Sequence, residues 1–168
     1  MNVLELFKPI KVFVFDVDGV LTDGSLMLSE DGSMLRSMNI KDGFALQLAI
    51  KKGYKIWIIS GGTSEAVKSR LQKLGLTDVH IAVKNKKHLL QQLMQSYEVS
   101  AAEMLYMGDD IPDLEVMQLC GLPCCPADAV IEIQQIATYI SPYTGGKGAV
   151  RDVIEKVLKL NHHWDLHE

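Results

Sequence analysis

Cysteine is scarce in this chain of 168 residues, which has three in all, two of them adjacent at Cys124 and Cys125. Thiols in this number and spacing form neither a disulfide framework nor a zinc-binding pattern. Apolar runs are also short, and none approaches the roughly 20 residues that span a bilayer. The first residues lack the basic segment and long apolar core of a signal peptide. We therefore expect a cytoplasmic protein that does not bind a membrane.

Positive charge is not in excess either, because 17 Lys and Arg residues face 21 Asp and Glu residues, for a net charge of −4. Nucleic acids are usually bound by basic surfaces, so we expect no nucleic-acid partner. The motif G-x-x-x-x-G-K-[ST] is absent, which excludes a P-loop kinase. Hydrophobic residues at 48% and charged residues at 23% are ordinary for a globular protein. With no internal repeat or low-complexity linker, the length suits one domain over residues 1–168.

Expected strands and helices alternate along the chain. We treat residues 1–9 as a short lead-in. Short apolar runs typical of buried strands lie at about 11–15, 54–59, 79–82, 104–107, 121–125 and 138–140. Helices are expected between them, at about 43–51, 65–74, 86–97, 112–119, 129–136 and 149–160. This alternation predicts an α/β sandwich with a parallel sheet.

A β-hairpin is expected at about residues 23–39, where two strand-like segments flank the turn-forming residues 29–33. A two-stranded hairpin is marginally stable by itself and has little core in which to bury apolar side chains. Packing against copies of itself in a homo-oligomer would bury them. The apolar residues concerned are Leu26, Met27, Leu28, Met34, Leu35 and Met38.

The segment KVFVFDVDGVLTDG, Lys11–Gly24, begins as a buried strand and continues into Asp16 and Asp18. In an extended chain, residues two apart point the same way, so both carboxylates would share one face. Two such carboxylates repel each other unless a cation or a shared proton separates them. The pair therefore suits a Mg²⁺ site or a nucleophilic aspartate. On these residues alone, a turn that closes a strand explains the pair equally well.

Other strand ends carry polar groups that suit a phosphate ligand. In open parallel sheets, ligands bind beyond the carboxyl ends of the strands, so these groups would converge on one cleft with Asp16 and Asp18. They are Ser60-Gly61-Gly62, Lys86 at the start of a helix, and Asp109-Asp110 with Asp113.

Four segments follow one another in the order and spacing of four known motifs: DVDGVLTDG, IISGG, an isolated lysine and GDDIPD. In these the chain resembles the haloacid dehalogenase (HAD) phosphatase superfamily. The lack of a large cap insertion, the hairpin and the sequence GGKGAVR resemble one branch, the 3-deoxy-D-manno-octulosonate 8-phosphate (KDO 8-phosphate) phosphatases and their sister nononate 9-phosphate phosphatases. The resemblance covers roughly residues 11–157. It implies a Rossmann-like HAD fold, a three-layer sandwich with a central parallel sheet and a hairpin in place of a cap.

The resemblance also implies the chemistry, which is Mg²⁺-dependent hydrolysis of a phosphomonoester through an aspartyl-phosphate. Asp16 would be the nucleophile, and Asp18 the general acid and then the base. Asp16, the backbone carbonyl of Asp18, and Asp109 would bind Mg²⁺. The substrate would be KDO 8-phosphate, in lipopolysaccharide precursor synthesis, with nononate 9-phosphate as the alternative. A related non-catalytic tetramerisation module is a weaker alternative, because that module lacks the nucleophile.

Further roles are implied at positions that match the family's motifs. Ser60 and Gly61 would bind the phosphate, and Lys86 would bridge it to Asp16, with Lys84 and Lys87 as rival lysines. Asp110 and Asp113 would form a second metal shell or else compensate a helix N-terminus.

Substrate recognition would involve a neighbouring subunit of a homotetramer with shared sites. Arg70, and more weakly Lys73, would reach the carboxylate of the sugar acid. The glycine-rich segment 144–149, with Gly146 and Lys147, resembles a flexible segment that closes over a neighbour's cleft. Gly62 departs from the pattern, in which KDO 8-phosphate phosphatases often have Arg and nononate 9-phosphate phosphatases can have Glu.

Overall fold

Parallel strands form the central sheet of the computed structural model, which describes residues 2–167. Their order in the sheet is β5-β4-β1-β6-β7-β8. β1 is central, and its last residue, Phe15, lies opposite Ile58 of β4 and Met107 of β6. The carboxyl ends of these three strands therefore lie side by side. The strands are β1 (Val12–Phe15), β4 (Lys55–Ile59), β5 (Asp78–His80), β6 (Met104–Met107), β7 (Leu122–Cys125) and β8 (Tyr139–Ile140).

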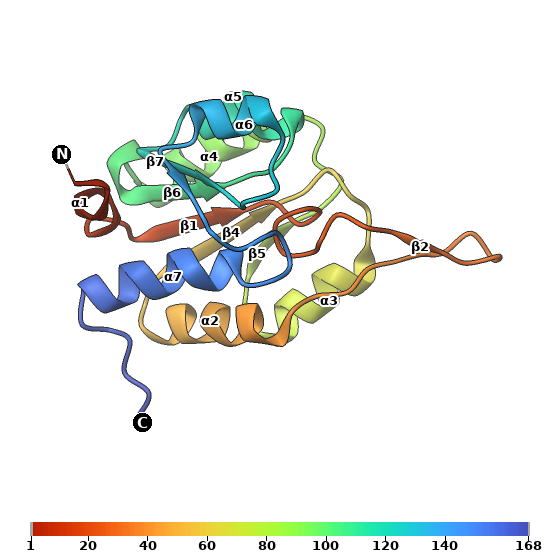
Figure 1. The fold of residues 1–168 in the computed structure, drawn as a ribbon, viewed down its shortest axis with the longest axis horizontal. Helices are drawn as coiled ribbons and strands as arrows, with labels where there is room; N and C mark the ends of the chain where they lie inside the picture. Colours follow the sequence, from red (N-terminus) through yellow and green to blue (C-terminus); the bar gives the residue numbers. More distant parts are fainter. Residues whose placement is uncertain (1, 168) are drawn as a thin grey trace.

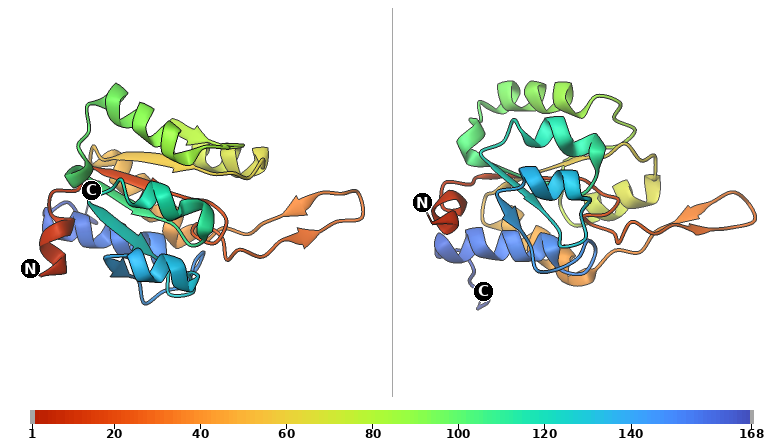
Figure 2. Two further views of the ribbon diagram at one scale, coloured as in Figure 1. Left: turned by 90° about the horizontal axis from the view of Figure 1, so that it is seen from above. Right: turned by 45° about the horizontal axis from the view of Figure 1, so that its top comes forward.

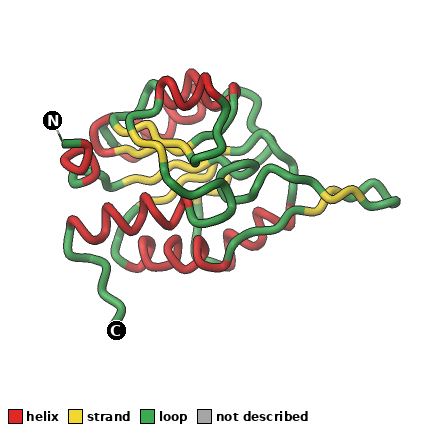
Figure 3. Tube along the Cα trace, viewed as in Figure 1, coloured by secondary structure: helices red, strands yellow, loops and turns green. Residues whose placement is uncertain are grey.

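Helices cover both faces of the sheet, as Figures 1 and 3 show. One face packs against α2 (Ile40–Lys51), α3 (Glu65–Lys73) and α7 (Ala149–Leu160), and the other against α4 (Lys86–Tyr97), α5 (Leu114–Met117) and α6 (Ile131–Ile136). Side chains of β1 alternate between the two cores, with Phe13 and Phe15 in the first and Val12 and Val14 in the second. Two short 3₁₀ helices, η1 (Ala101–Glu103) and η2 (Ile111–Asp113), flank β6. The expected three-layer α/β sandwich is confirmed.

The lead-in expected at residues 1–9 contains a helix, α1 (Val3–Phe7). Asn2 caps it, because its side chain accepts a hydrogen bond from the backbone N–H of Leu4. Phe7 is fully buried, and its ring packs edge-on against Tyr139 at 5.2 Å between centroids. So short a helix shows no repeating pattern of apolar residues from which the sequence could predict it.

The hairpin projects away from the body of the molecule (Figures 1 and 2). Its paired strands, β2 (Met27–Leu28) and β3 (Met34–Leu35), are antiparallel and shorter than expected. Met27 and Leu28 are 70% and 73% exposed. Met38 packs partly against the core, but the other five apolar side chains of the hairpin stay exposed within their own chain.

Helix α2 begins at Ile40, three residues before the expected start at Gly43. Asn39 caps it by accepting a hydrogen bond from the N–H of Lys41 at 2.8 Å.

Across residues 2–167, no helix has both the length and the apolar character needed to cross a membrane.

Candidate active site

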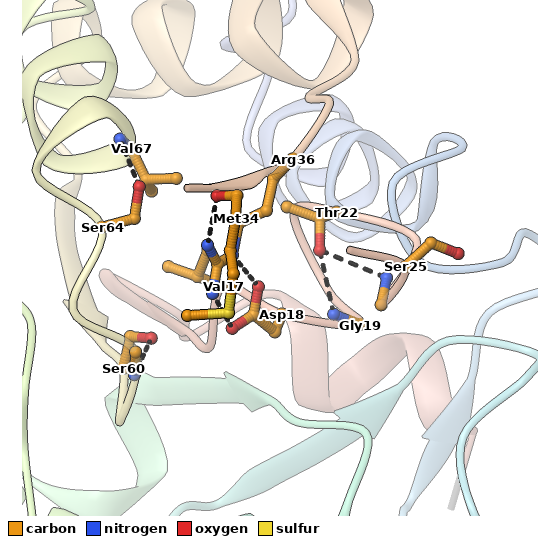
Figure 4. Close-up of polar contacts among 12 residues, drawn as sticks. Val17, Asp18, Gly19, Thr22, Ser25, Met34, Arg36, Ser60, Ser64 and Val67 are labelled. Carbon is orange, nitrogen blue, oxygen red and sulfur yellow. Dashed lines mark hydrogen bonds and ion pairs between the residues drawn. The ribbon is translucent and has the colours of Figure 1, made fainter. Parts of the chain in front are cut away.

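The loop after β1 holds Asp16 and Asp18 in fixed positions. Asp16 is buried, its backbone N–H donates to Met107, and its carboxylate accepts from the N–H of Val17 at 2.7 Å. The hydroxyl oxygen of Thr22 accepts from the N–H groups of Gly19 and Gly24, at 3.2 Å each. These bonds fold the loop back on itself (Figure 4).

Gly19 lets the loop after β6 approach the loop after β1. A Cβ at this position would lie 1.8 Å from Oδ2 of Asp109, and the residue has a φ of +83°. That φ lies in the region that glycine tolerates best. The lack of a side chain at Gly19 therefore allows Asp109 to reach the cleft.

Three carboxylates form a cluster at this junction: oxygens of Asp16, Asp109 and Asp113 all lie within 4.8 Å of one another. Oδ1 of Asp109 is buried and has no hydrogen-bond partner among the described residues. Burial, and then the charge of Asp113, raise the pKa of Asp16 to about 8. Burial, with Asp113 and Asp110 nearby, raises the pKa of Asp109 to about 7. A hard divalent cation offsets such repulsion and suits these oxygen ligands, so the residues fit a metal site.

Asp113 is fully buried and accepts three hydrogen bonds. Its Oδ1 accepts from Nζ of Lys86 and from the hydroxyl of Tyr106, each at 2.8 Å. Its Oδ2 accepts from the backbone N–H of Asp109 at 3.2 Å. Asp113 therefore ties together the ends of β6 and α4.

Lys86 lies between two carboxylates, with Nζ 3.1 Å from Asp16 and 2.8 Å from Asp113. Burial lowers the pKa of Lys86, but the two carboxylates outweigh it and the net shift is upward. Lys86 is 8% exposed, whereas Lys84 and Lys87 are exposed at the surface. Of the three rival lysines, Lys86 is the one that the structure places against Asp16.

Ser60 follows β4 and is 3% exposed. Its hydroxyl oxygen accepts from the N–H of Gly62 at 3.1 Å, so the turn itself uses that amide. The hydroxyl proton of Ser60 remains available for an anion.

Asp110 is exposed and caps η2, with its Oδ1 accepting from the N–H of Ile111.

A cavity of about 270 Å³ joins these groups at the carboxyl ends of β1, β4 and β6. Carboxylates, an ammonium group and a hydroxyl line it, a set that can bind a cation and a phosphate together. Its lining comprises Asp16, Asp18, Gly24, Ser60, Gly61, Gly62, Lys86, Asp109, Asp110, Pro112 and Asp113.

Arg36 is a site residue that the sequence analysis missed. Its Nε lies 2.6 Å from Oδ1 of Asp18, and its Nη2 lies 3.3 Å from Oδ2 (Figure 4). In the sequence, only the apolar side chains of the hairpin indicate a role for it. The available signal was a lone arginine at the base of an apolar hairpin that leaves from the Asp18 loop.

The residues expected to recognise substrate in a neighbour's site lie outside the cavity of their own chain. Arg70 and Lys73 are exposed on α3 and do not line the cavity. Gly146 is buried and donates its N–H to Val20 at 2.9 Å, while a Cβ at Gly145 would lie 1.8 Å from a backbone oxygen. These contacts pack the two glycines against the loop after β1, and the expected closure of segment 144–149 over a neighbour's cleft stays a prediction. Lys147 is exposed.

Comparisons with known proteins agree with this geometry. A family model described as haloacid dehalogenase-like hydrolase matches residues 31–121. The 3-deoxy-D-manno-octulosonate 8-phosphate phosphatase KdsC of Escherichia coli (strain K12) is 31% identical over 157 residues, which cover 94% of this chain and 84% of the relative.

Solved structures are similar over nearly the whole chain. A 3-deoxy-D-manno-octulosonate 8-phosphate phosphatase from Moraxella catarrhalis, in complex with a magnesium ion, a phosphate ion and a KDO molecule, gives a TM-score of 0.90 at 31% identity, covering 95% of this chain and 91% of that one. The cobalt-bound deoxy-D-mannose-octulosonate 8-phosphate phosphatase (YrbI) from Haemophilus influenzae gives 0.88 at 29% identity, covering 94% and 92%. Because the family model spans more than half of the sequence and KdsC aligns with nearly all of it, the chain belongs to the haloacid dehalogenase-like hydrolases, among the phosphatases related to KdsC.

Proposed function

We propose that this protein hydrolyses KDO 8-phosphate to KDO and phosphate, with Mg²⁺ as its cofactor. One observation carries the proposal: Lys86 is buried between Asp16 and Asp113, at a cavity whose carboxylates suit a divalent cation. This arrangement places positive charge beside a nucleophile, as phosphoryl transfer requires. The magnesium, phosphate and KDO bound to the Moraxella catarrhalis relative support the choice of metal and substrate.

In the proposed reaction, a carboxylate oxygen of Asp16 attacks phosphorus, and the bond from phosphorus to the sugar oxygen breaks. Asp18 donates a proton to the leaving oxygen and then takes one from the water that hydrolyses the aspartyl-phosphate. Ser60 and the Gly61 amide hold the phosphate, while Lys86 offsets its charge. Mg²⁺, held by Asp16, Asp109 and the Asp18 carbonyl, would supply the charge that lets an anion approach these carboxylates.

Asp113 and Asp110 take different supporting roles in this proposal. Asp113 uses both oxygens to accept from protein donors, one of them Lys86, so it positions the lysine. Asp110 lies exposed at the rim of the cavity, where it would hold a metal-bound water.

We further propose that the chain forms one domain and acts as a cytoplasmic homotetramer. The exposed hairpin supports an oligomer, because Met27, Leu28, Met34 and Leu35 are all at least half exposed. Arg70, Lys73 and Lys147 are exposed and would act in a neighbour's site.

The proposed chemistry is tested by three variants. Asp16→Asn should abolish phosphate release and keep the fold, as judged by circular dichroism. Lys86→Met should lower kcat by about 100- to 1,000-fold, whereas Lys87→Met, the exposed neighbour, should not. Near-wild-type turnover of Asp16→Asn would sink the nucleophile assignment.

The alternative substrate is nononate 9-phosphate, because Gly62 matches neither family pattern. Comparing kcat/KM for KDO 8-phosphate, nononate 9-phosphate and simple sugar phosphates decides between them. A flat profile would contradict a dedicated sugar-acid phosphatase.

A further inference from the structure

Arg36 is held beside the active-site cavity although the hairpin around it is exposed. Its side chain is 10% exposed, against 51% and 54% for the nearby residues Met34 and Leu35. Two of its nitrogens donate to the two oxygens of Asp18, and Nη1 donates to the carbonyl of Met34 at 3.3 Å. This fork geometry is the one with which arginine binds any carboxylate.

The guanidinium lies in a small cavity next to the active-site cavity. Asp18, Ser60 and Gly62 line the main cavity and also a small adjoining cavity that Arg36 completes. In the proposed reaction Asp18 touches the leaving oxygen, so a group that covers Asp18 also borders the leaving group. Figure 4 shows the Arg36 side chain reaching Asp18, with Ser60 at the lower left of the view.

Gly62 leaves room for this guanidinium. A Cβ at residue 62 would lie 3.2 Å from Oδ2 of Asp18 and 3.7 Å from Nη2 of Arg36. A Cβ at this distance is in ordinary contact with Arg36, so only a longer side chain at position 62 would reach the space that the guanidinium occupies. The two positions face one point of the cleft from different loops.

We propose that Arg36 binds the carboxylate of the leaving group from within the same subunit, beside the Arg70 that a neighbour would contribute, and that it exchanges Asp18 for that carboxylate when substrate binds. The inference rests on the proposed function. The exchange replaces one carboxylate with another, so the guanidinium keeps a charged partner throughout. Asp18 is 37% exposed on its side chain, so water can solvate its carboxylate while the guanidinium, which is 10% exposed, moves from one carboxylate to the other.

The exchange makes the leaving group's carboxylate a condition for efficient turnover. A phosphomonoester without a carboxylate leaves Arg36 on Asp18, where both oxygens of that side chain stay engaged. A sugar-acid phosphate draws the guanidinium away and frees Asp18 to face the leaving oxygen. Arg36 thus acts on selectivity between substrates and leaves the phosphate-binding groups unchanged.

The test compares kcat/KM for KDO 8-phosphate and for mannose 6-phosphate, which lacks a carboxylate. In Arg36→Met, kcat/KM for KDO 8-phosphate should fall by about 10- to 100-fold, mainly through KM, while that for mannose 6-phosphate should rise, because Asp18 is no longer engaged by the guanidinium. Arg36→Lys keeps the charge but not the fork and should fall in between. Lys41→Met, an exposed cation after the hairpin, is the control and should keep wild-type selectivity.

A relocation variant separates recognition from folding. Adding Gly62→Arg to Arg36→Met should restore part of the preference for KDO 8-phosphate, because a guanidinium again faces the cleft. The inference is overturned if Arg36→Met keeps the wild-type preference. It is also overturned if Arg36→Met loses both activities equally and the added Gly62→Arg restores neither. In both cases the phosphatase assignment stands. A wild-type protein with equal kcat/KM for both substrates would instead overturn the substrate proposal, and the role of Arg36 with it.

Discussion

Lys86 and Asp113 form a buried ion pair, with 2.8 Å between Nζ and Oδ1 and no exposed surface on Asp113. Asp113→Asn removes the charge that holds the ammonium in place. With Mg²⁺ present to offset repulsion among the carboxylates, we expect a loss of about 1–3 kcal/mol in the free energy of unfolding. Turnover should fall as well, because Lys86 loses its fixed position. Urea denaturation and phosphate release measure the two effects.

Tyr106→Phe is the matched control for this prediction. It removes one neutral donor to the same carboxylate and keeps the charge pair. We expect a cost of about 1 kcal/mol and little change in turnover. Equal effects of the two variants on turnover would show that Asp113 does not act through the charge of Lys86.

Stability of the metal-free protein should fall as the pH rises from about 4 to 8. Burial and neighbouring carboxylates raise the pKa of Asp16 to about 8 and of Asp109 to about 7, from 3.8 for both. Between the unfolded and folded values the native state binds protons that the unfolded chain does not, so stability is lost as these protons leave. Under the proposed function Mg²⁺ would take their place, and its binding should release protons.

Melting temperatures with Mg²⁺ and with EDTA, across pH 6 to 8.5, check this linkage. The stabilisation by Mg²⁺ should grow with pH, and calorimetry in two buffers of different ionisation enthalpy should detect the released protons. Asp16→Asn should remove much of the pH dependence of the stability, since it removes the carboxyl group with the higher of the two pKa values. A Mg²⁺ effect that is constant with pH would contradict the proposed ligands.

The sequence predicted the fold and most of the cavity because both follow from local patterns. Asp16, Ser60 and Asp109 each come directly after a strand or one residue beyond it, and a parallel register brings such positions to one edge. Arg36 was missed because its contact with Asp18 depends on the path of a hairpin between them. The role of Asp113 was left open because its partners come from β6 and α4, whose approach no local pattern specifies.

The apolar hairpin should control the oligomeric state. Leu28→Glu places a charge on a side chain that is 73% exposed in the single chain and, in the proposed tetramer, buried. We expect smaller species by multi-angle light scattering at micromolar concentration. Ser29→Glu adds the same charge at the adjacent turn and should leave the tetramer intact. A wild-type monomer would overturn the assembly, whatever the variants do.

Gly19 and Gly32 offer a direct test of why glycine is needed beside the carboxylate cluster. Both have a positive φ, of +83° and +89°, so alanine strains either backbone by roughly 1–2 kcal/mol. A methyl group at Gly32, in the hairpin turn, would have no atom within 4 Å, whereas a methyl group at Gly19 would lie 1.8 Å from Oδ2 of Asp109. Gly32→Ala should therefore lose stability alone, and Gly19→Ala should lose Mg²⁺ affinity and turnover too. Isothermal titration with Mg²⁺ separates these effects, and unchanged affinity in Gly19→Ala would show that Asp109 does not need its observed position to bind the metal.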